Sequence, residues 1–237
     1  MPRGANRLSR EERDALASYA ARAVWPAGFV VYQRGAPADG LFVVLRGRVV
    51  LRSRVRAGRG FVPGIAGPGE TFGAEGLSGN ARYATDARAD EETETLHLSM
   101  TRFRTYLREQ PQGALRLIGQ VMTERTSLLE KLRELTTMSV EQRLIATLMR
   151  MAQQESFRHP DGHLELCAQR YRLLCELVGA TRESVSLVLS RLVGDGLVER
   201  SGSTFIVTSP EHLAARLEGS WLETTDGAGG TLSKELH

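Results

Sequence analysis

The sequence predicts an α+β protein with an N-terminal antiparallel β-roll, a long dimerisation helix and a C-terminal winged helix-turn-helix. Three observations support this fold class. Short β-rich runs interrupted by glycine extend from Trp25 to about Leu98. Residues 112–137 then repeat apolar side chains at helical spacing. The segment from 169 to 208 has the order helix, turn, helix, hairpin.

These patterns divide the chain into four parts. Residues 1–111 form a β-roll effector-type domain and residues 112–138 the dimerisation helix. Residues 139–218 form the winged helix-turn-helix domain. Residues 219–237 contain the run TTDGAGGT, which predicts a flexible tail.

The composition is that of a globular protein. Of the 237 residues, 41% are apolar and 25% are charged. No apolar run approaches the roughly 18 residues that a membrane span needs, and the N-terminus lacks a secretory apolar core. We therefore expect a cytoplasmic protein without membrane contact. The two cysteines, Cys167 and Cys175, are too few for a disulfide framework and are predicted to be buried free thiols.

The first helix is predicted for residues 8–24. Ser9 can cap its N-terminus, and Glu12, three residues later, supplies the partner of a capping box. An apolar stripe of Leu16, Tyr19, Ala20 and Ala23 extends the helical pattern.

The β-rich region follows. Its turn signals recur about every ten residues, which favours an antiparallel barrel or roll. Six arginines lie along one hairpin of this region, and we interpret them as a solvated strand face: Arg46, Arg48, Arg52, Arg54, Arg56 and Arg59.

The long helix carries a heptad pattern. Strict spacing at a and d positions favours a partner helix, and hence a homodimer, over packing on the helix's own domain. Arg125 interrupts the pattern, and two facing arginines would repel each other unless Glu124 or another group pairs with them. The seam, spaced 3, 4, 3, 4 and 3 residues apart, is Ile118, Val121, Arg125, Leu128, Leu132 and Leu135.

The C-terminal third begins with a helix at 139–153, capped by Ser139. A short helix at 169–177, a turn at Gly179 and a second helix at 181–194 follow. Two strands and a turn then occupy residues 195–208, in the order of a winged helix-turn-helix.

The second helix of such a motif enters the major groove of DNA. Thr181 is a natural N-cap whose hydroxyl, or the first N–H groups of the helix, can hold a phosphate. Arg182 can donate two hydrogen bonds to guanine, and Glu183 can accept one from cytosine. Ser186 stays on the outward face. The alternative is an ordinary solvated first turn.

No catalytic site stands out. The chain has no evident nucleophile–base pair, metal cluster or phosphate-binding loop, so neither an enzyme nor a metal site is predicted. His159 and His163 flank PDG in a loop at 157–163, but two histidines alone are a weak metal signal.

The segment GATRESVSLVLSRLVGDGLVE resembles the helix-turn-helix of the cyclic-AMP receptor protein/FNR (CRP/FNR) family of bacterial transcription regulators. Upstream, PAGFVVYQRGAPADGLFVVLRGRVVL resembles the start of that family's β-roll and GPGETFG its central loop. The resemblance covers about residues 20–217. It implies a homodimer that binds palindromic double-stranded DNA and works with RNA polymerase. The alternative is a cyclic-nucleotide-binding module that regulates a protein partner.

The resemblance also identifies a departure in DNA reading. The family's third base-reading position falls on Leu187, where the cyclic-AMP receptor has an arginine that reads a further guanine. Leucine can instead touch a thymine methyl group, so we expect a different half-site.

The candidate effector pocket departs further from the family pattern. Gly73 and Arg82 match the family's phosphate cassette, but Ala74 stands at its glutamate position, with Glu75 one residue away. Tyr83 replaces a small hydroxyl residue. Where the cyclic-AMP receptor offers Thr and Ser to adenine, this chain has Leu128 and Leu129.

These four departures disfavour cyclic AMP bound in the usual way. Another effector, or activity without one, stays open. No cofactor is predicted with certainty, and the β-roll contains no cysteine for an iron–sulfur sensor.

Overall fold

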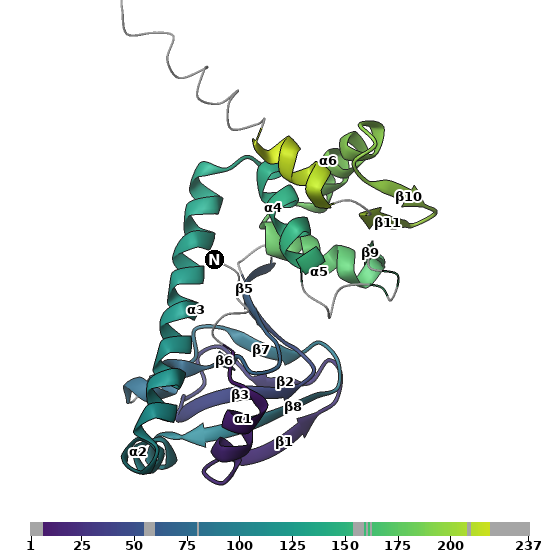
Figure 1. The fold of residues 1–237 in the computed structure, drawn as a ribbon. Helices are drawn as coiled ribbons and strands as arrows, with labels where there is room; N and C mark the ends of the chain where they lie inside the picture. Colours follow the sequence, from purple (N-terminus) through teal and green to yellow (C-terminus); the bar gives the residue numbers. More distant parts are fainter. Residues whose placement is uncertain are drawn as a thin grey trace, which may run out of the picture. The chain divides into compact units, whose positions relative to one another are not determined.

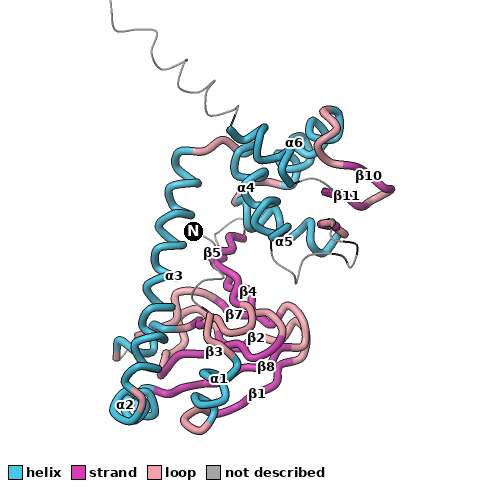
Figure 2. The backbone as a smooth tube through the Cα atoms, in the orientation of Figure 1, coloured by secondary structure: helices cyan, strands magenta, loops and turns pink. Residues whose placement is uncertain are grey.

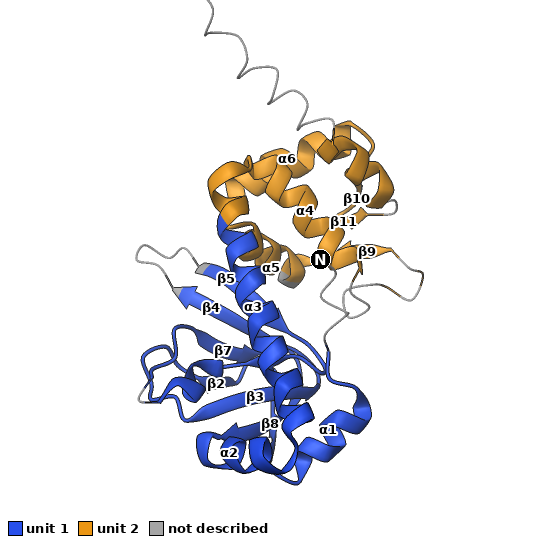
Figure 3. Ribbon diagram, turned by 60° about the vertical axis from the view of Figure 1, so that its left-hand side comes forward, with its two compact units in different colours: residues 1–132 blue, residues 133–237 orange. Residues whose placement is uncertain are grey.

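The structure is a computed structural model with two compact units, Met1–Leu132 and Arg133–His237, coloured separately in Figure 3. It describes residues 7–54, 60–79, 81–153, 159, 161, 163–207 and 210–218. The predicted flexible tail at 219–237 lies outside these residues.

The first unit contains two four-stranded sheets with the orders β1-β8-β3-β6 and β2-β7-β4-β5 (Figure 1). The described strands pair antiparallel, as the β-roll prediction requires. The strands are β1 (Ala21–Trp25), β2 (Val30–Tyr32), β3 (Gly40–Arg46), β4 (Val49–Arg54), β5 (Gly60–Ala66), β6 (Thr71–Phe72), β7 (Asp86–Ala89) and β8 (Thr93–Ser99). The helices are α1 (Arg10–Ala17), the 3-10 helix η2 (Ala74–Ser78), α2 (Met100–Glu109) and most of α3 (Pro111–Thr137), whose last five residues belong to the second unit.

Strand β3 organises the core because it is buried on both faces. Successive side chains of a strand point to opposite faces. Leu41 and Val43 therefore join a cluster that includes residues of α1, α2 and α3. Phe42 and Val44 join a second cluster, which contains Tyr32 of β2 and other strand residues. The first part of α3 is thereby packed onto the sheets and its position in this unit is set.

The first helix is shorter than predicted. The capping box is present, because the Ser9 hydroxyl accepts from the Glu12 N–H at 3.2 Å and the Glu12 carboxylate accepts from the Ser9 N–H at 2.7 Å. However, α1 ends at Ala17, and Ala21–Trp25 forms β1. The prediction of a helix to residue 24 was wrong because hydrogen bonding to β8 overrides the local helical pattern.

The arginine-rich hairpin is not uniformly solvated. Arg48 is only 8% exposed, and its guanidinium donates to the Asp90 carboxylate from Nε at 3.0 Å and from a terminal nitrogen at 2.7 Å. The interpretation of a solvated face is therefore wrong for Arg48, because its buried guanidinium is paired with the half-buried Asp90 carboxylate. Arg46 does lie exposed and pairs with Glu92. Arg56 and Arg59 lie outside the described residues.

Replacing Arg48 with alanine should lower the free energy of unfolding by about 3 kcal/mol, because the largely buried Asp90 carboxylate loses its charged partner. Arg46→Ala is the matched control, since it breaks a pair exposed on both sides and should cost less than about 1 kcal/mol. Urea unfolding followed by circular dichroism measures both changes. Equal losses in the two variants would contradict the assignment of Arg48 to a buried ion pair.

The second unit is a winged helix-turn-helix. The helices of the motif, α5 and α6, begin and end within one residue of their predicted bounds. Apolar faces of α4, α5 and α6 pack together, and a three-stranded sheet of order β10-β11-β9 forms the wing. Figure 2 distinguishes these helices and strands by colour. The elements are α4 (Val140–Gln153), β9 (Leu164–Leu166), α5 (Ala168–Val178), α6 (Arg182–Gly194), β10 (Glu199–Ser201) and β11 (Thr204–Val207).

The two cysteines differ in environment. Cys175 is buried, and burial raises the pKa of its thiol. Cys167 is exposed, so the prediction of a buried thiol was wrong there. It occupies the N-cap of α5, a position that precedes the packed face of the helix.

Among the described residues, no helix combines the length and apolarity needed to cross a membrane.

Candidate functional site

A tight turn separates α5 from α6. Gly179 has φ +66° at the C-cap of α5, a conformation that favours glycine, and its N–H donates to the Cys175 carbonyl at 3.0 Å. Thr181 then caps α6, because its hydroxyl accepts from the Ser184 N–H at 3.3 Å. The left-handed conformation of Gly179 thus ends α5, and the Thr181 side chain fixes where α6 begins.

The two faces of α6 have opposite character. Its inner face is buried through Val185, Val188, Leu189 and Leu192. Leu187 on the outer face is 60% exposed. All the predicted DNA-reading residues are exposed here: Thr181, Arg182, Glu183, Ser186 and Leu187.

The first turn of α6 carries a charged pair of opposite sign. Hydrogen bonds from its own backbone N–H and from the Thr181 hydroxyl lower the pKa of the Glu183 carboxyl. Glu183 is therefore ionised at neutral pH and is an acceptor only. Arg182 beside it presents donors only. The turn can consequently match a surface that offers both acceptors and donors, as the base edges of the major groove do.

Tyr171 of α5 connects the parts of this surface, and sequence reasoning missed it. Its hydroxyl donates to the Arg182 carbonyl at 3.1 Å. Its ring stacks on Phe205 of β11, with centroids 6.2 Å apart. The guanidinium of Arg200 in the wing lies over the same Phe205 ring, 5.7 Å from its centroid. The only signal in the sequence was an aromatic residue inside the first helix of the motif.

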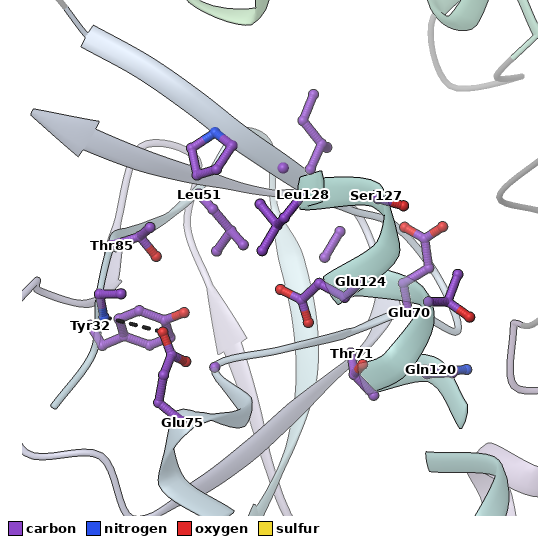
Figure 4. A pocket seen from close by; sticks show the side chains of 17 residues that line it. Tyr32, Leu51, Glu70, Thr71, Glu75, Thr85, Gln120, Glu124, Ser127 and Leu128 are labelled. Carbon is purple, nitrogen blue, oxygen red and sulfur yellow. Dashed lines mark hydrogen bonds between the residues drawn. The ribbon is translucent and has the colours of Figure 1, made fainter. Parts of the chain in front are cut away.

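A second candidate site is a cavity of about 160 Å³ in the first unit. Strands β4 and β5, the segments before and after β6, and one face of α3 contribute its lining. Figure 4 shows Glu75 and Glu124 beside Tyr32 in this cavity. The lining residues that the structure describes include three carboxylates, Glu70, Glu75 and Glu124, and no Lys, Arg or His.

The structure brings only part of the predicted effector pocket to the cavity. Gly73, Glu75 and Leu128 line it. Ala74, Arg82, Tyr83 and Leu129 are not among the lining residues in the described part of the chain. Arg82 is exposed, and its guanidinium donates to the Gly35 carbonyl at 2.6 Å.

Glu75 places a negative charge where the predicted phosphate cassette lies. Its carboxylate accepts from the Ala84 N–H at 3.1 Å, the hydrogen bond dashed in Figure 4. Burial and then the charge of Glu75 raise the pKa of Tyr32. Burial, with smaller contributions from Asp39 and Glu75, raises the pKa of Tyr83 to about 12. The two tyrosine rings stack with centroids 3.6 Å apart.

Sequence reasoning missed most of the polar cavity lining. Gln120, Glu124 and Ser127 face the cavity from α3. Their spacing of four and three residues is that of one helix face, so a polar stripe on the long helix was the available signal. The Gln120 amide nitrogen donates to the Gly69 carbonyl at 2.8 Å, which ties α3 to the segment before β6.

The exposed apolar stripe of α3 differs in register from the predicted seam. The two share Ile118, Arg125 and Leu132, which are exposed. Val121 and Leu135 are half-buried, and Leu128 is 43% exposed but also lines the cavity. The exposed set, also spaced 3, 4, 3, 4 and 3, is Leu115, Ile118, Met122, Arg125, Leu129 and Leu132. We call this set the α3 stripe.

Two family models match this chain. The model of the cyclic nucleotide-binding domain matches residues 22–110, and the model of the Crp-like helix-turn-helix domain matches residues 142–216. Together they cover more than half of the chain.

Relatives and solved structures agree with these models. The chain is 26% identical over 187 residues to the cAMP-activated global transcriptional regulator CRP of Haemophilus influenzae, covering 77% of this chain and 82% of that protein. It is 28% identical over 201 residues to the cAMP-activated global transcriptional regulator Vfr of Pseudomonas aeruginosa, covering 82% and 92%. The c-di-GMP responsive regulator CLP of Xanthomonas campestris shares the fold at a TM-score of 0.74 and 22% identity, covering 85% of this chain and 100% of that one.

Proposed function

Because this chain belongs to the CRP/FNR family of transcription regulators, we propose that it acts as a homodimer on palindromic DNA and reads each half-site with α6. The family consists of transcription regulators rather than enzymes. Its helix-turn-helix disfavours the alternative of a module that only regulates a protein partner. RNA polymerase is the further partner that we expect at a promoter, from the family resemblance.

The exposed first turn of α6 carries this proposal. The N-terminus of α6, which Thr181 caps, can hold a phosphate with its backbone N–H groups. Arg182 and Glu183 present the donor and acceptor groups that select guanine and cytosine. Leu187 adds an exposed apolar contact suited to a thymine methyl group.

The α3 stripe supports the proposal of a homodimer. Its five apolar members are between 38% and 59% exposed in the single chain, and a and d spacing is the pattern that a second helix covers. A two-fold dimer would present two α6 helices, and its operator would share that symmetry. We therefore propose half-sites about one helical turn, or about 10 base pairs, apart.

We further propose that this regulator does not bind cyclic AMP in the usual way. A cyclic phosphate beside Ala84 would meet the Glu75 carboxylate, which already accepts that N–H. The like charges would repel each other in a partly buried cavity, where water screens them weakly. Arg82, the residue that matches the family's phosphate-binding arginine, is held by the Gly35 carbonyl. The cavity remains suited to another effector.

Selection from a random DNA library by the purified protein, with and without 1 mM cyclic AMP, tests both proposals. Such a concentration is about 1,000 times a micromolar Kd, so a functional site would be saturated. We expect the same palindrome to be enriched under both conditions. A monomer without sequence preference would refute the regulator. Enrichment only with cyclic AMP would leave the regulator standing and refute the proposed role of Glu75.

A further inference from the structure

Three side chains with metal-binding atoms gather in the loop before β9. His159, Asp161 and His163 each offer one such atom, and these atoms lie within 4.8 Å of one another. The two imidazole rings stack with centroids 4.7 Å apart and an interplanar angle of 18°. A carboxylate oxygen of Asp161 lies 3.0 Å from Nδ1 of His159. The sequence places Asp161 between the two histidines, and the structure brings the three side chains together.

The backbone explains why the three side chains meet. The His159 N–H donates to the His163 carbonyl at 2.9 Å, which closes the loop at its two ends. This main-chain hydrogen bond holds His159 and His163 close to each other, with Asp161 between them in the sequence.

We propose that His159, Asp161 and His163 bind one divalent transition-metal ion, with Zn²⁺ as the best match. Two imidazole nitrogens and one carboxylate oxygen suit metals of intermediate softness better than Mg²⁺ or Ca²⁺, which prefer oxygen. Three protein ligands leave a fourth position of a tetrahedral ion for water or another group.

The distances require only local adjustment. Donor atoms at about 2.0–2.1 Å from one tetrahedral ion lie about 3.4 Å from each other. In the structure the three ligand atoms lie within 4.8 Å of one another, so they would have to move closer together. The side chains of His159 and Asp161 are 41% and 75% exposed. They can therefore rotate toward a shared ion without disturbing a packed core.

The place of the site in the fold suggests what the ion does. The loop leads directly into β9, whose Leu164 and Leu166 pair with Val207 and Phe205 of wing strand β11. Phe205 in turn stacks on Tyr171 of α5. An ion at the start of β9 would restrain the strand that joins the wing to the helix-turn-helix. This site lies in the second unit, separate in sequence and in unit from the cavity.

Isothermal titration of the full chain with ZnCl₂ tests the proposal. The protein carries no polyhistidine tag and is first stripped with EDTA. We expect one ion per chain with a Kd at or below about 10 µM, within the range that titration resolves. His159→Ala and His163→Ala should each weaken binding at least about tenfold, and Asp161→Asn should also weaken it.

His212→Ala is the matched control, because His212 is an exposed histidine of the same unit. Its Zn²⁺ affinity should equal that of the unsubstituted protein. The proposal is overturned if the unsubstituted protein shows no saturable binding up to about 100 µM Zn²⁺. It is equally overturned if both single-histidine variants bind as tightly as the control. Circular dichroism without Zn²⁺ verifies folding, and if a histidine variant misfolds, Asp161→Asn at its exposed position decides the test.

Discussion

Leu129→Glu should raise the dissociation constant of the dimer at least about 100-fold and abolish DNA binding at nanomolar protein. Leu129 is 59% exposed in the single chain and belongs to the α3 stripe. In the dimer of the variant, each copy would lose the about 1.5–3 kcal/mol of stabilisation that burial of the leucine side chain provides. Two carboxylates would also face each other across the seam, where desolvation raises their cost. Sedimentation velocity measures the dimer, and fluorescence anisotropy with a selected palindrome measures DNA binding.

Gln112→Glu provides the matched control for this prediction. It adds the same charge at an exposed position of the same helix, away from the α3 stripe. Its dimer should remain intact.

Leu128→Glu distinguishes the predicted seam, which contains Leu128, from the α3 stripe, which contains Leu129 instead. Leu128 lines the cavity, so its substitution should leave a dimer formed through the α3 stripe intact. If Leu129→Glu remained dimeric while Leu128→Glu dissociated, the predicted seam would be the interface and the α3 stripe would not.

Arg182→Ala should cost about 1–3 kcal/mol of DNA-binding free energy and relax the preference at one base pair of each half-site. The side chain is exposed at the start of α6, where it can donate two hydrogen bonds to the O6 and N7 atoms of guanine. Arg182→Lys should retain attraction to DNA but lose most of the base preference, because an ammonium group lacks the planar pair of donors. Binding to operators with each single-base change measures both effects.

Arg191→Ala is the corresponding control. Arg191 also lies on α6, but near its C-terminal end, with its guanidinium 3.5 Å from a carboxylate oxygen of Glu141. Base preference should be unchanged in this variant. If Arg182→Ala weakened binding to every sequence equally, Arg182 would contact only phosphate, and base reading would pass to other residues of α6.

Much of the fold followed from local patterns. The helix-turn-helix was predicted to within one residue, because Gly179, the Thr181 cap and the apolar spacing of α6 all act over a few residues. The roll was predicted from glycine-punctuated alternation, which depends on the period of a strand. The same reliance on local spacing made the predicted first helix too long. The apolar residues keep a helical spacing up to Ala23, but residues 21–25 pair with β8 as strand β1.

The lining of the cavity in the first unit was predicted only in part. Glu75 was noted beside the family's glutamate position, but its hydrogen bond to the Ala84 N–H depends on how η2 lies against the following segment. Glu70, Gln120 and Glu124 come from segments distant in sequence. Their convergence is a long-range property that a single sequence does not display.

The sequence by itself determined the succession of β-roll, long helix and helix-turn-helix, and which face of α6 is exposed, because caps, turns and periodicity operate between near neighbours. Only the tertiary structure decided the register of the α3 stripe and the partner of the buried Arg48. Both heptad registers satisfy the spacing equally well. The β-roll covers one side of α3 and leaves Leu129 exposed. Asp90 likewise reaches Arg48 across 42 residues. Burial depends on which surfaces meet, and that is settled when the whole unit packs.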